Sequence, residues 1–531
     1  MNSQPEEGRK KEAPGRVVSG VGWNFFGMIA GSIAGFLSSI LVARWLGAAE
    51  FGNLSLALSV LNVLVVLSAL GFEFALNKYI PVLLLEKNPQ GIRFLVERLT
   101  AVKVVIALAL SAFIFLAADA VSAWLFQKPA LGLYLRVMSL MVLPFALEPI
   151  YRGLLTGLYQ QKFINLLDVA SKFLYLLLAL FALWLGYGVV GVLLASLVAM
   201  AFFVALAARK GLASIPDGGR RSAGARPPLG RVLRFSFYLY LFSIMNFVLG
   251  VQLDLMMIGA MVPDIRQVAY YTVAYSLSYT ILSFLSLALQ GGITLTYFSE
   301  LHARKDLEGL RRGFLVMMEY VYVFIIPFTV IGVIFTPEIL LLLFGDAYSG
   351  RTAVMLLLLY FPTMAIMKFG MITSTFMGAM EKEKNLVVSR GIFGAVNLTL
   401  NFTFIPVFGA FGALLGTAAA VFAGLVYEIS VVQKCLRPRY PWRFLGRMTA
   451  LSLASGAAAL LLKLVLQRLD LFQGTTEALF ILAGAGLPWL ALTALLFVAL
   501  KPLSAETVDV VGNAPLPFKG RLIPMIRPRG P

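Results

Sequence analysis

Ionisable side chains interrupt the long apolar segments of this chain, and their types suit the binding of charged groups better than covalent chemistry. The 531 residues are 60% hydrophobic and only 13% charged, whereas a typical soluble protein is about 45–50% apolar and about 25% charged. A charge inside an apolar segment is costly, so each one is a candidate functional residue. The candidates are Arg44, Glu73, Arg136, Glu148, Arg152, Asp168, Lys172, Asp254, Glu319, Lys368, Arg390, Glu428 and Lys463.

Two pairs of opposite charge stand four residues apart. Glu148 with Arg152, and Asp168 with Lys172, have the spacing that brings side chains together on one helix face. Each pair has two interpretations that the sequence leaves open, a neutralised pair near the inner membrane boundary or a set of ligands. Three further charges lie near helix ends or on late helices, and we expect their side chains to reach the membrane surface; they are Arg390, Glu428 and Lys463.

Residues for nucleotide hydrolysis or metal chemistry are missing from the sequence. Cys435 and His302 are the only residues of their types, which excludes a disulfide framework and a histidine-based metal cluster. The dipeptide Gly-Lys never occurs, so a Walker-type ATP site is excluded. We therefore predict that the protein is not an enzyme, holds no metal and needs no cofactor.

Long apolar runs indicate an all-α polytopic membrane protein. A helix needs about 20 apolar residues to cross a hydrocarbon layer of about 30 Å, and the mean hydropathy is +0.87. We predict about fourteen transmembrane helices. They are expected near residues 20–45, 53–77, 98–118, 131–158, 164–185, 188–208, 234–260, 268–296, 314–336, 352–379, 386–406, 409–433, 446–466 and 477–500.

The distribution of lysine and arginine predicts the orientation in the cytoplasmic membrane. The loops and tails on the N-terminal side hold 33 of these cations, with Lys103 counted as a loop residue, and the opposite side holds 5. Cytoplasmic loops carry the excess of positive charge, so both termini are expected in the cytoplasm. The net charge of +18 then reflects topology and attraction to anionic lipid headgroups, and no nucleic-acid partner is expected.

An internal repeat predicts two parallel lobes. The segment that starts at residue 154 aligns without gaps to the segment that starts at residue 375, an offset of 221, and it places Gly157, Gly188 and Gly191 on glycines. Parallel repeats are a common transporter plan, in which substrate binds between the halves. The predicted parts are a basic tail (1–19), an N-lobe (20–208), a cytoplasmic linker (209–233), a C-lobe (234–433), two extra helices (446–500) and a cytoplasmic tail (501–531).

Four blocks of sequence resemble a known family. They are "LVARWLGAAEFGNLSLALSVLNVLVVLSALGFEFALNKYIP", "LDLMMIGAMVPDIRQVAYYTVAYSL", "IFTPEILLLLFGDAYSG" and "STFMGAMEKEKNLVVSRGIFGAVNLTLNFTFIPVFGAFGALLGTAAAV". They are similar to the bacterial polysaccharide-export, or oligosaccharide flippase, family of the multidrug/oligosaccharidyl-lipid/polysaccharide exporter superfamily, over about residues 17–435. The resemblance implies a flippase that moves a lipid-diphosphate-linked oligosaccharide by alternating access, driven by H⁺ or Na⁺ or by the membrane potential. Its implied partners are membrane lipids and glycan polymerases or glycosyltransferases.

The resemblance gives the intramembrane charges expected roles. Lys368 has no acidic residue three or four positions away, and a lysine that faces a cavity suits an anionic diphosphate. Arg152, Lys172 and Arg44 are the further candidates for substrate binding. Arg44 and Asp254 lie toward the outer ends of helices 1 and 7, where they form either a gate or a structural pair. With Glu73, they are the candidates for a gate or for ion coupling.

Three other functions stay open. A multidrug or cation antiporter of the same superfamily would use a carboxylate-lined site. A membrane glycosyltransferase or polymerase would need catalytic motifs and a large outer loop, and the outer loops of this chain are short. A scaffold for a glycan-synthesis complex would need no charged cavity.

The charge bias generates a topological prediction. With Cys435→Ser as background, a cysteine at Gly224 should react with a membrane-impermeant thiol reagent only after the cells are opened. A cysteine at Ser349 should react in intact cells. Labelling of residue 224 from outside intact cells would contradict the orientation.

Overall fold

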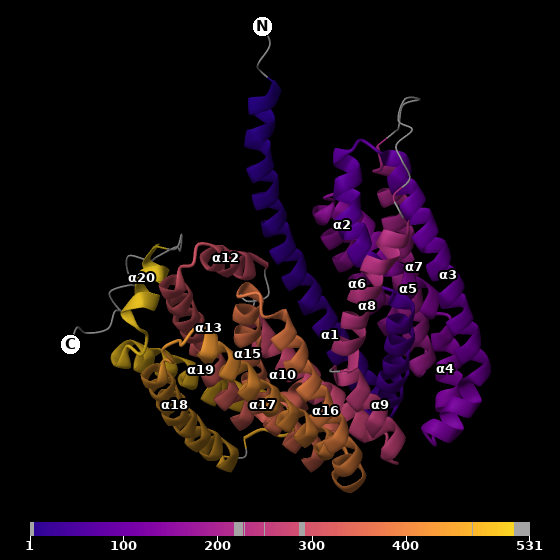
Figure 1. Ribbon diagram of the computed structural model, residues 1–531. Helices are drawn as coiled ribbons and strands as arrows, with labels where there is room; N and C mark the ends of the chain where they lie inside the picture. The colour runs from indigo at the N-terminus through magenta and orange to yellow at the C-terminus, as the bar shows by residue number, and fades with distance from the viewer. Residues whose placement is uncertain are drawn as a thin grey trace. The chain divides into compact units, whose positions relative to one another are not determined.

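The computed structural model describes residues 5–216, 227, 229–248, 250–285, 292–469 and 471–513, and every regular element in these residues is a helix (Figure 1). Up to residue 265 the elements are α1 (Pro5–Ala69), α2 (Phe72–Leu85), α3 (Pro89–Ala120), the π-helical turn η1 (Val121–Leu125), α4 (Leu131–Ser139), α5 (Val142–Gly157), α6 (Gln161–Trp184), α7 (Gly188–Ala213), α8 (Leu229–Val248) and α9 (Val251–Met261). From residue 266 on they are α10 (Arg266–Leu285), α12 (Gly292–Ala303), α13 (Leu307–Ile334), α14 (Thr336–Phe344), the 3₁₀ turn η2 (Asp346–Tyr348), α15 (Arg351–Ala379), α16 (Glu383–Phe408), α17 (Ala410–Cys435), α18 (Trp442–Arg468), α19 (Thr475–Leu500) and α20 (Ala505–Asn513).

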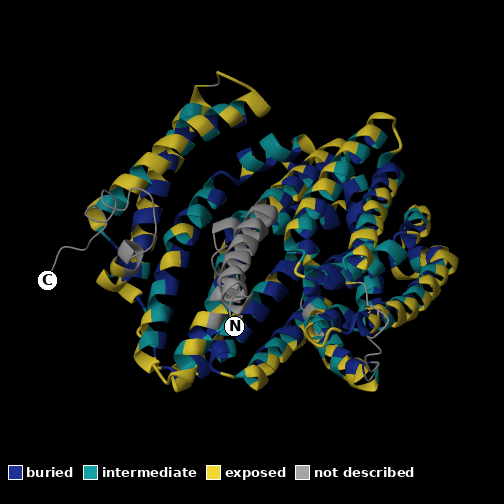
Figure 2. Ribbon diagram, turned by 90° about the horizontal axis from the view of Figure 1, so that it is seen from above, coloured by how far each residue is buried: buried dark blue, intermediate teal, exposed yellow. Residues whose placement is uncertain are grey.

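The helices confirm an all-α, multi-pass membrane protein. Among the described residues, ten helices are long and apolar enough to span a membrane, and the bent pair α4–α5 makes an eleventh. Large apolar side chains lie exposed on several of them, including Leu116 (82%), Val407 (71%) and Trp184 (70%), as expected for surfaces that face lipid. Figure 2 shows exposed residues along the helices. The number fourteen stays a prediction, because the expected span 234–260 falls on two short helices and the span 268–296 crosses residues 286–291, outside the described part of the chain.

Two glycines with a positive φ, Gly47 and Gly71, interrupt the helices in the region of the first two predicted spans. The run of helix that forms α1 has a non-helical residue at Gly47, with φ 72° and ψ 172°, a conformation that is open to glycine and strained for other residues. The break lies where the sequence predicts the turn between helices 1 and 2. A second break follows at Gly71, with φ 69°, before α2 begins. At its other end α1 begins at Pro5 instead of residue 20. Most of the residues from 6 to 11 are good helix formers.

The chain forms two compact units, residues 1–269 and 270–531. This division lies inside α10, and the predicted lobe boundary at 209–233 stays a prediction, since residues 217–226 and 228 are outside the described part.

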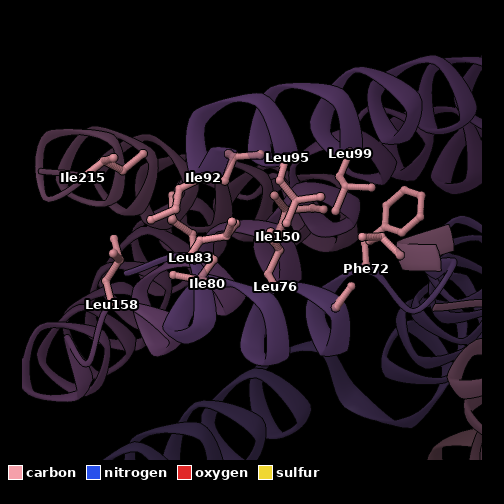
Figure 3. Packing of buried hydrophobic residues seen from close by; sticks show 14 residues of the cluster. Phe72, Leu76, Ile80, Leu83, Ile92, Leu95, Leu99, Ile150, Leu158 and Ile215 are labelled. Carbon is pink, nitrogen blue, oxygen red and sulfur yellow. The ribbon is translucent and has the colours of Figure 1, made fainter. Parts of the chain in front are cut away.

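In the first unit α2, α3 and α5 share an apolar core (Figure 3), to which the chain after α7 and the start of α8 contribute. It comprises Phe72, Ala75, Leu76, Ile80, Leu83, Ile92, Leu95, Val96, Leu99, Ile150, Leu154, Leu158, Ile215 and Val232. Gly157 permits the close approach of α5, since a Cβ there would lie 2.8 Å from the Cβ of Ile80.

The bounds of two helices in each unit agree with the internal repeat. Shifting α6 and α7 by 221 residues places their ends within three residues of the ends of α16 and α17. Gly188 and Gly409, which align in the repeat, have φ of 53° and 60° at the same turn. The two halves of the sequence therefore build the same helix pair, α6–α7 and α16–α17, and the helix before each pair, α5 or α15, ends at the equivalent position.

A buried ion pair joins α18 to α14 in the second unit. Lys463 Nζ donates to Glu338 Oε2 and to the carbonyl of Ile334, both at 2.8 Å, and the two charged side chains are 9% and 6% exposed. An apolar cluster that includes Phe335 and Trp489 surrounds this contact. The expectation that Lys463 reaches the membrane surface is wrong, because Glu338, 125 residues away in the sequence, neutralises it.

This pair predicts a large stability effect. Lys463→Met should lower the free energy of unfolding by about 3–5 kcal/mol, because it leaves the Glu338 carboxylate buried without its cation. Adding Glu338→Leu should restore most of that loss, and Arg468→Met, on the exposed end of the same helix, is the control. Thermal unfolding of the purified protein in detergent measures all three. An unchanged Lys463→Met protein would contradict a stabilising pair.

Candidate functional site

The second unit contains a cavity of about 690 Å³ between α15, α16 and α17, with side chains of α10 and α12 at its wall. Its lining is mostly apolar, but it includes the ionisable residues Lys368, Arg390 and Glu428. Ligand sites commonly combine a largely apolar cavity with a few convergent polar groups. The polar and aromatic lining residues that accompany the three charges are Tyr279, Ser374, Thr375, Ser389 and Phe393.

Lys368 is held in the cavity wall by contacts with α10. The residue is 5% exposed, its Nζ donates to Ser283 Oγ at 2.9 Å, and it lies 5.1 Å from the ring centroid of Tyr279. None of these described contacts is with an acidic group. The ammonium group is therefore oriented by a neutral hydroxyl and an aromatic face, and it keeps donors for an anion.

Glu428 lies in the same cavity, where hydroxyl groups satisfy its carboxylate. It is 2% exposed and accepts hydrogen bonds from Thr373 Oγ1, from Ser374 Oγ (3.1 Å to Oε1) and from Ser389 Oγ (2.8 Å). The expectation that Glu428 reaches the membrane surface is wrong. Its side chain turns inward because α15 and α16 both present hydroxyls to it, and only the fold brings these hydroxyls together.

Arg390 completes the charged wall and is half-buried. Its guanidinium donates to Ser374 Oγ at 3.1 Å, so this hydroxyl connects the arginine to Glu428. Two cations and one carboxylate thus border the cavity, an arrangement that can bind an anionic group by charge-assisted hydrogen bonds. The sequence prediction found Lys368 but assigned Arg390 and Glu428 to the surface.

In the first unit, the two predicted charge pairs form one network across α5 and α6. Arg152 pairs with Glu148, and its Nη2 lies 3.0 Å from Asp168 Oδ1. Lys172 Nζ lies 2.9 Å from Asp168 Oδ2. A Cβ at Gly31 would lie 3.0 Å from Lys172 Nζ, so the glycine lets α1 lie against the network. The substrate role of Arg152 and Lys172 stays a prediction. Their described ion pairs are with Glu148 and Asp168.

Glu73 lies beside a buried lysine that the sequence prediction placed in a loop. Lys103 on α3 is 0% exposed, donates to the carbonyl of Ala69 at 3.3 Å and interacts electrostatically with Glu73 and Glu148. Counting Lys103 among the loop cations was wrong. Without it, the excess of lysine and arginine on the N-terminal side remains, because Lys103 is one of 33 such residues. The Oε2 of Glu73 is buried with no hydrogen-bond partner among the described residues, and its role in ion coupling stays a prediction.

Arg44 and Asp254 both belong to the first unit, on α1 and α9. Asp254 is 4% exposed and the residue Arg44 is exposed. The two helices pack closely, since Ser59 Oγ lies 3.1 Å from Gln252 Oε1 and a Cβ at Gly259 would lie 2.6 Å from Leu56 Cδ1. The pairing of Arg44 with Asp254 stays a prediction.

Lys128, in the loop after η1, fixes the end of α9. Its Nζ donates to the carbonyls of Gly259 at 2.7 Å and Val262 at 2.9 Å, and to that of Phe126 at 3.2 Å. Burial lowers the pKa of Lys128, and the nearby Asp264 carboxylate partly opposes this effect. A cation at a helix C-terminus is favoured by the helix dipole, so this contact holds α9 within the first unit.

The two charged sites occupy equivalent positions of the repeat. With the offset of 221, Asp168 aligns with Ser389, and Phe203 aligns with Gly424. The ring of Phe203 lies 5.0 Å from the Arg152 guanidinium, whereas Gly424 borders the cavity. This alignment was available in the sequence and could have placed Ser389 and its neighbour Arg390 in a site.

The fold is that of all-helical transporters. The chain is similar to a solved structure described as "Lipid II flippase MurJ, inward closed conformation", with a TM-score of 0.70 and 14% identity over 90% of this chain and 99% of that one. It is also similar to the inward-facing conformation of a multidrug resistance MATE family transporter of the MOP superfamily, with a TM-score of 0.59 and 16% identity over 76% and 96% of the two chains. At these identities the likeness shows the fold.

The family follows from the sequence itself. Residues 41–353 match the family described as "Polysaccharide biosynthesis protein", which is more than half of the chain, and the chain belongs to that family. The membership predicted from the four sequence blocks is confirmed. A sequence comparison with curated proteins finds no match.

The predicted gate has a direct test. Arg44→Asp and Asp254→Arg should each impair export of surface glycan, and the double exchange should restore part of it if the two side chains interact. Glycan at the cell surface and protein abundance in the membrane are measured together. Additive defects without rescue would leave the two residues in separate structural roles.

Proposed function

We propose that the protein is a flippase that moves a lipid-diphosphate-linked oligosaccharide across the cytoplasmic membrane for cell-surface polysaccharide synthesis. The observation that carries the proposal is the cavity wall with Lys368 and Arg390, in a chain of the polysaccharide biosynthesis family. The likeness of its fold to a lipid II flippase supports the same substrate class, a glycan on a lipid diphosphate.

Lys368 and Arg390 have different roles in binding the diphosphate. Lys368 acts as a point charge toward the diphosphate and Arg390 as a planar fork. Ser283 and Tyr279 orient the lysine, and the hydroxyls around Glu428 hold that carboxylate in place beside the anion. The basic cavity holds the diphosphate, and the lipid tail stays in the bilayer between the helices.

Transport occurs by alternating access of the two lobes, with both termini in the cytoplasm. An ion gradient or the membrane potential drives the cycle, because the sequence has no Walker-type ATP motif. Arg44, Asp254 and Glu73 are the candidates for coupling and gating, and Arg152 and Lys172 for a second contact with substrate.

Glu428 favours a second candidate, an antiporter for organic cations. A buried carboxylate surrounded by hydroxyls is a group that a cation or a proton can bind. The flippase is preferred because the same wall carries two cationic side chains, which oppose the entry of a cationic drug.

Lys368 tests the proposed function. Lys368→Gln should abolish or strongly reduce surface glycan at normal protein abundance, since a lost charge-assisted hydrogen bond costs about 1.5–3 kcal/mol, or about ten- to hundredfold in affinity. Lys368→Arg should retain part of the activity. The control is Lys384→Gln, at an exposed lysine outside the cavity.

Two outcomes would contradict the proposal. Normal export by Lys368→Gln would remove this residue from the site. Loss of resistance to cationic drugs in cells that lack the protein, with surface glycan unchanged, would favour the antiporter.

A further inference from the structure

A small polar pocket lies in the second unit, apart from the cavity of Lys368. It has a volume of about 90 Å³, and arginines from two segments converge on it, Arg311 and Arg312 near the start of α13 and Arg437 and Arg439 after α17. Two carboxylates, Glu308 and Glu506, stand at its wall. Four guanidinium groups thus face two carboxylates, and arginine stays charged at any physiological pH.

The fold holds the pocket in shape at two points. Arg311 Nε donates to the carbonyl of Leu436 at 2.9 Å, which joins the start of α13 to the end of α17. Glu319 on α13 accepts hydrogen bonds from the backbone nitrogen and the hydroxyl of Ser504, both at 2.9 Å, and so fixes the start of α20. Glu506 on α20 then lies 3.9 Å from Arg312. Among the described residues, Glu506 is the one carboxylate that pairs with Arg312, and this distance is at the outer limit of an ion pair.

The pocket is located at a membrane boundary. Its residues lie at the first turns of the candidate span Leu307–Ile334 and just after the end of the candidate span Ala410–Cys435. Trp442, three residues beyond Arg439, is 71% exposed, and tryptophan is enriched at the headgroup level of membranes. The charge bias of the loops assigns this side to the cytoplasm, where anionic lipids attract basic residues.

We propose that this pocket binds a single phosphate group, supplied by the headgroup of an anionic phospholipid. Arginine forks match phosphate oxygens bidentately, and basic pockets between transmembrane helices on the cytoplasmic side bind such headgroups. The pocket volume of about 90 Å³ is sufficient for the oxygens of one phosphate, because a water-sized group needs about 10–15 Å³. The pocket is too small for a glycan. Residues 514–531 carry only basic charged side chains, at Lys519, Arg521, Arg527 and Arg529, so this segment offers no carboxylate side chain in place of the phosphate.

The test uses the full chain in nanodiscs of phosphatidylcholine with increasing phosphatidylglycerol, and thermal unfolding as the readout. The wild type should be stabilised by phosphatidylglycerol, and Arg437→Gln/Arg439→Gln should need about tenfold more of it for the same shift. The matched control is Arg443→Gln/Arg447→Gln, which removes the same charge from exposed positions on the adjacent helix, outside the pocket. The control should respond as the wild type does.

A second variant acts in the opposite direction. Glu506→Gln removes the carboxylate that faces Arg312, so it should lower the amount of phosphatidylglycerol needed. Inorganic phosphate added to phosphatidylcholine discs identifies the source of the group: if it stabilises the wild type as well as the lipid does, free phosphate is the ligand, and if it does not, the headgroup is.

Two results would overturn the proposal. Equal losses in the two double variants would mean that diffuse surface charge attracts the lipid, and the pocket has no part in it. No stabilisation by either phosphatidylglycerol or phosphate would mean that no phosphate group binds. The readout does not use export, so failure of this proposal and failure of the flippase are separate results.

Discussion

A charge placed in a low-dielectric interior must be compensated by an opposite charge or by hydrogen bonds, and the arrangement of helices in this protein depends on that requirement. Lys463 on α18 meets Glu338 and a backbone carbonyl. Glu428 meets three hydroxyls from two helices. In each case the partner comes from another element, so the charged contact also fixes which helices are neighbours.

The two copies of the repeat meet this requirement differently. In the first unit, Arg152 and Lys172 are neutralised by Glu148 and Asp168, and the ring of Phe203 lies over the arginine. In the second unit the aligned positions hold Ser389 and Gly424, smaller residues that border a cavity of about 690 Å³. The same backbone arrangement therefore supports a closed ionic network in one copy and a cavity with a cationic wall in the other.

Glycine determines how close the helices around these sites come. Gly31 lets α1 lie against the Asp168–Lys172 pair, and Gly259 receives Leu56 between α1 and α9. Gly47 supplies a backbone conformation that ends the first half of α1. A Cβ at Gly31 would meet the ends of the Lys172 and Asp168 side chains at 3.0 and 3.2 Å, so this residue couples the packing of α1 to the geometry of the charges.

The sequence alone determined the all-helical membrane fold, the family and the repeat, because apolar length, loop charge and repeated glycines are local properties of the chain. It also singled out Lys368, since a lysine without an acidic residue at helical spacing can be recognised within one helix. Only the tertiary structure decided that Glu428, Lys463 and Lys103 are buried. It also decided that the pairs Glu148–Arg152 and Asp168–Lys172 form one network. Each of these outcomes depends on a partner supplied by another helix, such as Glu338 for Lys463 or Ser389 for Glu428. Sequence spacing carries no information on which distant helix supplies the partner, and the free energy of a buried charge depends mainly on that partner.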